Sequence, residues 1–158
     1  MSIEEKIKEL GYMLPEAVKP VGAYTPALKI GNLLFLSGIL PFVDGKLLKT
    51  GKVGKDLTIE EAQNEAIKVI LNALAIVKDH AGGLENIKQC IKITGYVATT
   101  SDFTEHPKVL NSASEFLLKI FGDKGKHCRV AVGVCSLPFN SPLEMDFIFE
   151  LRNLSNLP

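Results

Sequence analysis

The chain has 158 residues, of which 46% are hydrophobic and 23% are charged; this balance is typical of a globular domain and excludes a disordered chain. The 18 basic residues equal the 18 acidic residues, whereas proteins that bind a nucleic-acid backbone usually have a basic excess, so nucleic acid is disfavoured as a partner. The sequence has no uninterrupted stretch of about 18 to 20 apolar residues, so it predicts no membrane span.

The cysteines and the first residues predict the compartment. Cys90, Cys128 and Cys135 form an odd set without metal-ligand spacing. The chain begins MSIEEKIKELGY, which is too acidic for a targeting peptide and has no long apolar stretch. We therefore expect a cytoplasmic protein with reduced, mostly buried thiols and with no metal site.

The N-terminal quarter of the chain predicts a helix, a linker and a hairpin. Ser2 and Glu5 have the spacing of a capping box, and the apolar residues that follow lie on one helical stripe. Prolines at three positions between 15 and 26 then interrupt regular structure. A β-hairpin is predicted over residues 27–38, with Gly31-Asn32 as its turn.

The rest of the chain predicts two longer helices and three strands. A capping box at Thr58 and Glu61 begins a helix that Gly82-Gly83 ends, and a second helix runs from about 105 to 121 with Pro107 in its first turn. Strands are predicted over residues 86–100, around 128–135 and over 143–151.

This order of elements predicts an α+β fold. Two helices with one apolar face each would cover one side of a mixed sheet, which gives a two-layer sandwich. The other face of the sheet must then be solvated or covered by another subunit. We expect residues 1–20 to form a helical extension and linker, residues 21–152 the main domain, and residues 153–158 a C-terminal tail.

Arg129 stands out in an otherwise apolar strand. Because side chains alternate, Val130 and Val132 would face one way, into the core, and Arg129, Ala131 and Gly133 the other way. Ala131 and Gly133 are too small to cover the guanidinium, so they would leave a recess that suits a small carboxylate bound bidentately. The alternative is that Arg129 pairs with a neighbouring carboxylate on a solvated face.

Glu144 lies at the start of the last predicted strand, whose carboxylates could supply partners for Arg129. Alternation would place Glu144, Asp146 and Glu150 on the sheet face that carries Arg129. A simple hairpin centred on Phe139, however, would separate Arg129 from Glu144 by about five residues, or roughly 17 Å. Either the two strands are not directly paired, or the second group comes from another subunit.

The remaining candidates for chemistry are weaker. His80 and His106 lie near predicted helix ends, and His127 shares a face with Arg129, but each is expected to be an ordinary surface histidine. No nucleophile lies at a spacing that would complete a triad, and we expect Cys135 to be structural.

Several stretches resemble the RidA (YjgF) family. They are GAYTPAL at 22–28, LLFLSG at 33–38, CRVAVGVCSLP at 128–138 and LEMDFIFEL at 143–151, and the resemblance covers the chain from about residue 20 onward. It implies a chorismate-mutase-like fold and a homotrimer with ligand clefts between adjacent subunits. Such a composite cleft could combine residues that one hairpin keeps apart.

The resemblance also implies an activity and a site. Family members with the arginine hydrolyse reactive 2-imino or enamine acids to 2-keto acids and ammonia, without a cofactor or metal. Carried over by position, Arg129 would hold the substrate carboxylate and Glu144 would position or activate the attacking water. The substrate-binding positions would be Tyr24, Ser37, Gly38, Asn111 and Ala131. Two residues depart from the usual family pattern: Ile39 stands where glutamine is common, and Ala131 where cysteine is common.

Two alternatives come from other functional classes. A non-catalytic binding or regulatory protein could use the same Arg129 recess for a keto acid, and it would bind carboxylates without releasing ammonia. The family is also often labelled as endoribonuclease or translation inhibitor. The neutral charge balance and the lack of a basic stripe with stacking aromatics disfavour that reading.

Overall fold

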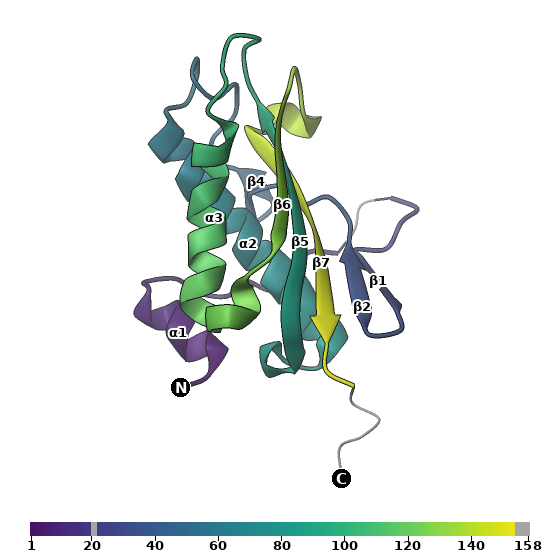
Figure 1. Cartoon of the computed structure of the whole chain (residues 1–158). Helices are drawn as coiled ribbons and strands as arrows, with labels where there is room; N and C mark the ends of the chain where they lie inside the picture. The colour runs from purple at the N-terminus through teal and green to yellow at the C-terminus, as the bar shows by residue number, and fades with distance from the viewer. Residues whose placement is uncertain (20–21, 154–158) are drawn as a thin grey trace.

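The structure is a computed structural model that describes residues 1–19 and 22–153. In this part of the chain five strands form one mixed sheet in the order β1-β2-β7-β5-β6 (Figure 1). β5 and β6 run parallel, and the other neighbours run antiparallel. The strand bounds are Ala27–Ile30 for β1, Leu33–Leu36 for β2, Ile87–Ala98 for β5, Cys128–Val134 for β6 and Leu143–Leu151 for β7.

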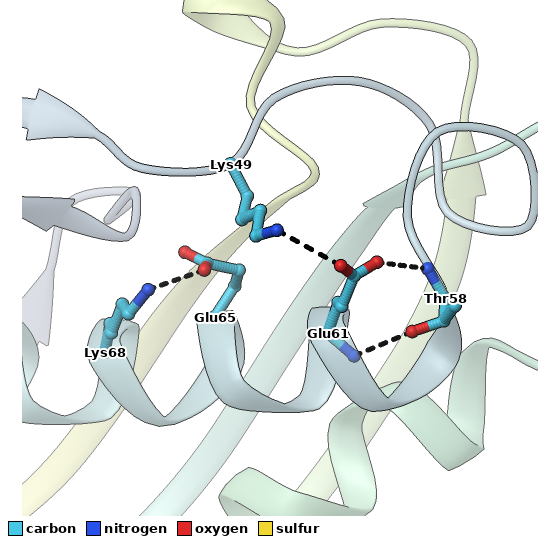
Figure 2. Close-up of polar contacts among 5 residues, drawn as sticks. All are labelled: Lys49, Thr58, Glu61, Glu65 and Lys68. Carbon is cyan, nitrogen blue, oxygen red and sulfur yellow. Dashed lines mark hydrogen bonds and ion pairs between the residues drawn. The ribbon is translucent and has the colours of Figure 1, made fainter.

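Helices α2 (Ile59–Ala81) and α3 (His106–Phe121) lie on the same face of this sheet (Figure 1). The capping box predicted for α2 forms: the Glu61 N–H donates to Thr58 Oγ1 at 3.1 Å, and the Thr58 N–H donates to Glu61 Oε2 at 2.9 Å (Figure 2). Gly82 ends α2 with φ of 73°, in the left-handed region that glycine adopts most easily. The predicted two-layer α+β sandwich is therefore confirmed.

The core lies between the two layers. Each of its central side chains is at most 1% exposed, and they come from both helices and from the middle strands of the sheet. They include Val69, Ile70 and Leu74 of α2, Val109, Ala113 and Leu117 of α3, and Ile93, Phe147 and Phe149 of the sheet.

One charged side chain is buried on α2. Glu65 is 2% exposed, and its Oε1 accepts from Lys68 Nζ at 2.6 Å (Figure 2). Its other carboxylate oxygen, Oε2, has no hydrogen-bond partner among the described residues. The helix therefore keeps a half-satisfied ion pair where an apolar residue would be usual.

The N-terminal helix α1 (Ile3–Glu9) packs against α3 and against the 3-10 turn Leu84–Asn86. Its capping box forms as predicted at Ser2 and Glu5, and Ile3 and Ile7 are buried. The Ile3 N–H donates to Glu85 Oε1 at 2.9 Å. The extension is therefore fixed to the helix layer.

The described residues contain a few shorter elements. A two-stranded hairpin joins β3 (Phe42–Val43) to β4 (Lys46–Leu47) through a turn at Asp44 and Gly45, whose φ values are 49° and 76°. Further 3-10 turns span Gly122–Gly125 and Pro138–Asn140.

The last two strands do not pair with each other. β5 lies between them, with β6 parallel on one side and β7 antiparallel on the other. The β5-α3-β6 segment is a strand-helix-strand crossover, which places β6 beside β5 in parallel. The simple hairpin of these two strands is thus wrong, and the alternative that they are not directly paired is correct.

The faces of β6 are also opposite to those predicted. Val130 and Val132 are 42% and 38% exposed, whereas Ala131 packs against the core. The physical reason is the close approach of α3 to the helix-facing side: a Cβ added to Gly133 would clash with His106, and one added to Gly95 of β5 would clash with Leu110. Small residues are needed beneath α3, so the valines face away from the helices.

The cysteines differ from their prediction as well. Cys90 is buried, and burial raises the pKa of its thiol to about 12. Cys128 and Cys135 are exposed, because they lie at the start of the edge strand β6 and just beyond its end. Only one of the three thiols is therefore buried.

The described residues contain no helix that combines the length and the apolar character needed to cross a membrane. They also contain no group of three histidine, cysteine, aspartate or glutamate side chains placed to hold a metal ion.

Candidate functional site

The Arg129 side chain lies against α3. Its Nη1 donates to Asn111 Oδ1 and to Ser114 Oγ, each at 3.0 Å. Asn111 and Ser114 are three residues apart, so they share one face of the helix. We call Arg129, Asn111, Ser114 and Ala131 the Arg129 group.

Among the described residues, Arg129 has no carboxylate partner for its charge. Within residues 1–19 and 22–153, none of the six ion pairs within 4.0 Å includes Arg129. In the single chain the guanidinium is therefore oriented by neutral oxygens and keeps its charge for another partner. A planar guanidinium of this kind suits a carboxylate that accepts two parallel hydrogen bonds.

His127 continues the network behind Arg129. Its Nε2 lies 2.9 Å from Ser114 Oγ, and its Nδ1 lies 2.6 Å from the Gly125 carbonyl oxygen. A carbonyl oxygen only accepts, so His127 Nδ1 donates to it, and in that tautomer of the imidazole Nε2 accepts from the Ser114 hydroxyl. That hydroxyl in turn accepts from Arg129. The expectation of an ordinary surface histidine is thus wrong for His127.

A second group of predicted residues lines a pocket elsewhere on the chain. Tyr24, Ser37, Gly38 and Glu144 all border one cavity of about 310 Å³, which we call the Glu144 pocket. The Ser37 hydroxyl donates to the Thr25 carbonyl oxygen at 2.7 Å. A Cβ added to Gly38 would clash with the Glu144 carboxylate, so a larger residue here would have to displace that carboxylate.

The Glu144 carboxylate has an altered proton affinity. It lies on β7 among residues that alternate strictly between buried and half-buried, and it belongs to the half-buried set. Desolvation by burial raises its pKa, and the nearby negative charge of Asp146 raises it further. A carboxylate with a raised pKa is better matched to taking up and returning a proton near neutral pH.

The structure does not bring the two groups together in one chain. Arg129 is in register with Ile93 and Phe147, whereas Glu144 is in register with Tyr96 and Val132, which is three residues further along β6. With about 3.3 Å per residue and two strand spacings of about 4.8 Å, the two Cα atoms are about 14 Å apart.

The two side chains also leave the sheet on opposite faces. Arg129 lies on the face that α3 covers, and Glu144 on the other face, as the burial of Leu143 and Met145 beside it requires. The prediction that Arg129 shares a face with Glu144 and Asp146 is therefore wrong, because it assumed that the β6 valines are buried.

Ser114 and His127 were not predicted as parts of the site. Ser114 carries one usable signal, since it lies three residues after Asn111 on a predicted helix. Its contact with Arg129 depends on how α3 crosses β6, which no local pattern indicates.

Comparison with known proteins places these features in a family. The family described as "YjgF/chorismate_mutase-like, putative endoribonuclease" matches residues 4–151. A relative from Trypanosoma cruzi, named Protein TCP17, is 35% identical over 152 residues, which cover 96% of this chain and 95% of that protein. A relative from Dermatophagoides farinae, named 2-iminobutanoate/2-iminopropanoate deaminase, is 25% identical over 138 residues, covering 87% of this chain and 93% of that protein.

Solved structures agree with the fold. A crystal structure of a protein of unknown function from Agrobacterium tumefaciens aligns with a TM-score of 0.89 at 43% identity, covering 94% of this chain and 92% of that chain. A family match across residues 4–151 includes both residue groups described above and all of α1 except Ile3. The chain therefore belongs to the YjgF/RidA family and has its chorismate-mutase-like α+β fold.

Proposed function

We propose that the protein hydrolyses small reactive 2-imino or enamine acids to 2-keto acids and ammonia, at a site that adjacent copies of the chain share. One observation carries this proposal. Arg129 is held in place by neutral oxygens and has no ion-pair partner among the described residues, and Glu144 is a half-buried carboxylate that borders a separate pocket. The deaminase name of the relative from Dermatophagoides farinae supports the reaction class.

The proposed roles follow from the chemistry of each group. Arg129 holds the substrate carboxylate through two parallel hydrogen bonds, which fixes the C=N carbon in place. Glu144 accepts a proton from water as the water oxygen bonds to that carbon and the C=N π electrons move to nitrogen; it then gives this proton to the nitrogen, which completes a neutral aminoalcohol. In the second step Glu144 takes the proton of the new hydroxyl and passes it to the amino nitrogen, so that the C–N bond breaks as the C=O bond forms, and ammonia leaves a 2-keto acid. No metal or cofactor is needed for these steps, because the imine is already electrophilic.

The uncovered face of the sheet supports assembly. Val130 and Val132 of β6 and Phe35 of β2 are 42%, 38% and 38% exposed on the side that no helix covers. An apolar sheet face of this kind is suited to contact with another subunit. We propose a homotrimer in which the Arg129 group of one subunit faces the Glu144 pocket of the next.

The test is an imine-hydrolysis assay on the wild type and on Arg129→Ala. An amino-acid oxidase generates the imine, and semicarbazide competes with the enzyme for it. Arg152 is the only other arginine of the chain, so Arg152→Ala is a matched control. We expect the wild type and Arg152→Ala to reduce trapping and Arg129→Ala to lose this effect.

Two outcomes would contradict the proposal. If neither the wild type nor Arg129→Ala changes the trapped fraction while 2-keto acids still bind the wild type, the site is a binding site and the protein is not a deaminase. If Arg129→Ala retains full activity, Arg129 does not hold the substrate carboxylate.

A further inference from the structure

We propose that Val18 and Lys19, at the end of the segment after α1, form a wall of the Glu144 pocket and that this wall makes the pocket selective for 2-imino acids with a bulky apolar side chain. The inference rests on the proposed function for its substrate class. It assigns a role to the N-terminal extension and to the part of the pocket that the reaction itself does not use.

Several contacts fix the start of this segment. Glu4 of α1 forms an ion pair with Lys78 of α2 at 2.9 Å, and the Tyr12 ring meets the edge of the Phe116 ring at 5.4 Å between centroids. Leu14 and Ala17 then pack against the core. The chain is thereby held along α2 until Val18 and Lys19 reach the Glu144 pocket.

The pocket wall is largely apolar apart from the residues proposed for chemistry. Its apolar side chains come from the N-terminal segment, the residue before β1, the chain after β2, α2 and the turn before β7. They include Val18, Pro26, Ile39, Leu40, Ile76 and Phe139. The cavity volume of about 310 Å³ is at the lower end of the usual range for small-molecule pockets, and a substrate with a single methyl side chain would leave much of it unfilled.

Phe139 adds an independent observation. Phe139 and Asn140 both have φ of 57°, a left-handed conformation that non-glycine residues seldom adopt. The Gly51 N–H holds this turn by donating to the Asn140 carbonyl oxygen at 2.8 Å. The Phe139 ring is 76% exposed and lies edge-on to Phe42, 5.8 Å between centroids. A strained turn that holds an aromatic ring over a pocket rather than in the core is placed for ligand contact.

Lys19 is the one cation on the pocket wall among the described residues. A cation there raises the alternative of a substrate with an acidic side chain. Lys19 is exposed and forms no ion pair with Glu144 among the described residues. We place it at the rim, where it would not select an acidic side chain. An acidic substrate is therefore the alternative that the experiment must separate.

The experiment measures binding of three 2-keto acids, the products of the proposed reaction, by calorimetry. The probes are pyruvate, 4-methyl-2-oxopentanoate and 2-oxoglutarate, applied to the wild type, to Val18→Glu and to Met13→Glu. Val18 and Met13 are 49% and 79% exposed on the same segment, but Met13 borders a different hollow, so the second variant is a matched control. Thermal unfolding checks that both variants fold.

We expect the wild type and Met13→Glu to bind 4-methyl-2-oxopentanoate at least about tenfold more tightly than pyruvate, because three further carbons enter an apolar wall. We expect Val18→Glu to lose most of this preference. Equal binding of the two probes, a preference that Val18→Glu retains, or tightest binding of 2-oxoglutarate would each overturn the inference.

The binding measurement separates this inference from the proposed function. A wild type that shows the preference but hydrolyses no imine would refute the deaminase proposal and leave the pocket assignment in place. A wild type that hydrolyses all imines without a side-chain preference would do the reverse.

Discussion

Two variants that are each inactive should restore activity when they form mixed trimers. Arg129→Ala removes the proposed carboxylate anchor, and Glu144→Gln removes the proposed proton acceptor while keeping the shape that fits beside Gly38. Loss of two charge-assisted hydrogen bonds should cost Arg129→Ala about 3 kcal/mol, or roughly 100-fold in kcat/KM. A combined site needs only one intact group from each of two subunits.

The expected recovery follows from the proposed trimer. Random mixing of equal amounts leaves about three quarters of the trimers mixed, and each mixed trimer has one of its three sites fully intact. About one quarter of wild-type activity should therefore return in the whole mixture, and about one third in purified mixed trimers. If the two groups acted within one chain, each variant chain would keep a defective site and mixing would recover nothing. The separation of about 14 Å and the opposite sheet faces of Arg129 and Glu144 argue against such a site.

The assay uses co-expression of the two variants with different affinity tags, two-step purification of mixed assemblies, and the semicarbazide competition. Mixing Arg129→Ala with the double variant Arg129→Ala/Glu144→Gln is the control and should recover nothing. If purified mixed assemblies stay as inactive as the separate variants, the two groups do not meet between subunits and the reasoning is refuted.

Three further predictions concern single groups of the site. Desolvation and the charge of Asp146 raise the pKa of Glu144, so activity should fall with decreasing pH as Glu144 is protonated. Asp146→Asn should shift this fall in the pH-rate profile to lower pH. An unchanged profile would contradict the role of Glu144. Gly38→Ala should lower kcat/KM about 100-fold with little change in thermal unfolding, because the new Cβ displaces the Glu144 carboxylate; retained activity would show that this contact does not position the base. Ser114→Ala should raise KM about tenfold while kcat changes less, because Arg129 loses one of its two orienting acceptors. The control is Ser112→Ala, which should leave KM unchanged because the Ser112 hydroxyl bonds the Gln63 and Val109 carbonyl oxygens and not Arg129. Equal effects of the two substitutions would argue for a general helix defect.

Features set by neighbouring residues could be predicted from the sequence. The capping boxes at Ser2 and Thr58 and the end of α2 at Gly82 form as predicted, because each depends on contacts within a few residues. The two-layer fold follows from the apolar stripes of the two long helices. Family resemblance named Arg129 and Asn111, which the structure joins by a hydrogen bond, but it did not name Ser114. It also named the four residues that border the Glu144 pocket together, which are Tyr24, Ser37, Gly38 and Glu144.

Features set by the packing of distant segments could not be predicted. The valines of β6 have the pattern of a buried strand face, yet α3 requires small residues beneath it, and the apolar side chains face away from the helices. The insertion of β5 between β6 and β7 decides where Arg129 and Glu144 lie, and alternation within each strand carries no information about it. The same holds for Val18, whose place in the pocket depends on the path of the chain over α2.

The buried Glu65–Lys68 pair should make a small part of the protein's stability depend on temperature. At 25 °C an unsatisfied carboxylate oxygen costs about 1 to 3 kcal/mol, so Glu65→Leu should stabilise the fold, since the 27% exposed Lys68 side chain can turn to water. The hydration of charged groups weakens as temperature rises, so the cost of keeping this carboxylate out of water shrinks on heating. The increase in the free energy of unfolding from Glu65→Leu should therefore be larger in urea unfolding at 25 °C than near the melting temperature. The buried charge on α2 is thus least unfavourable at high temperature.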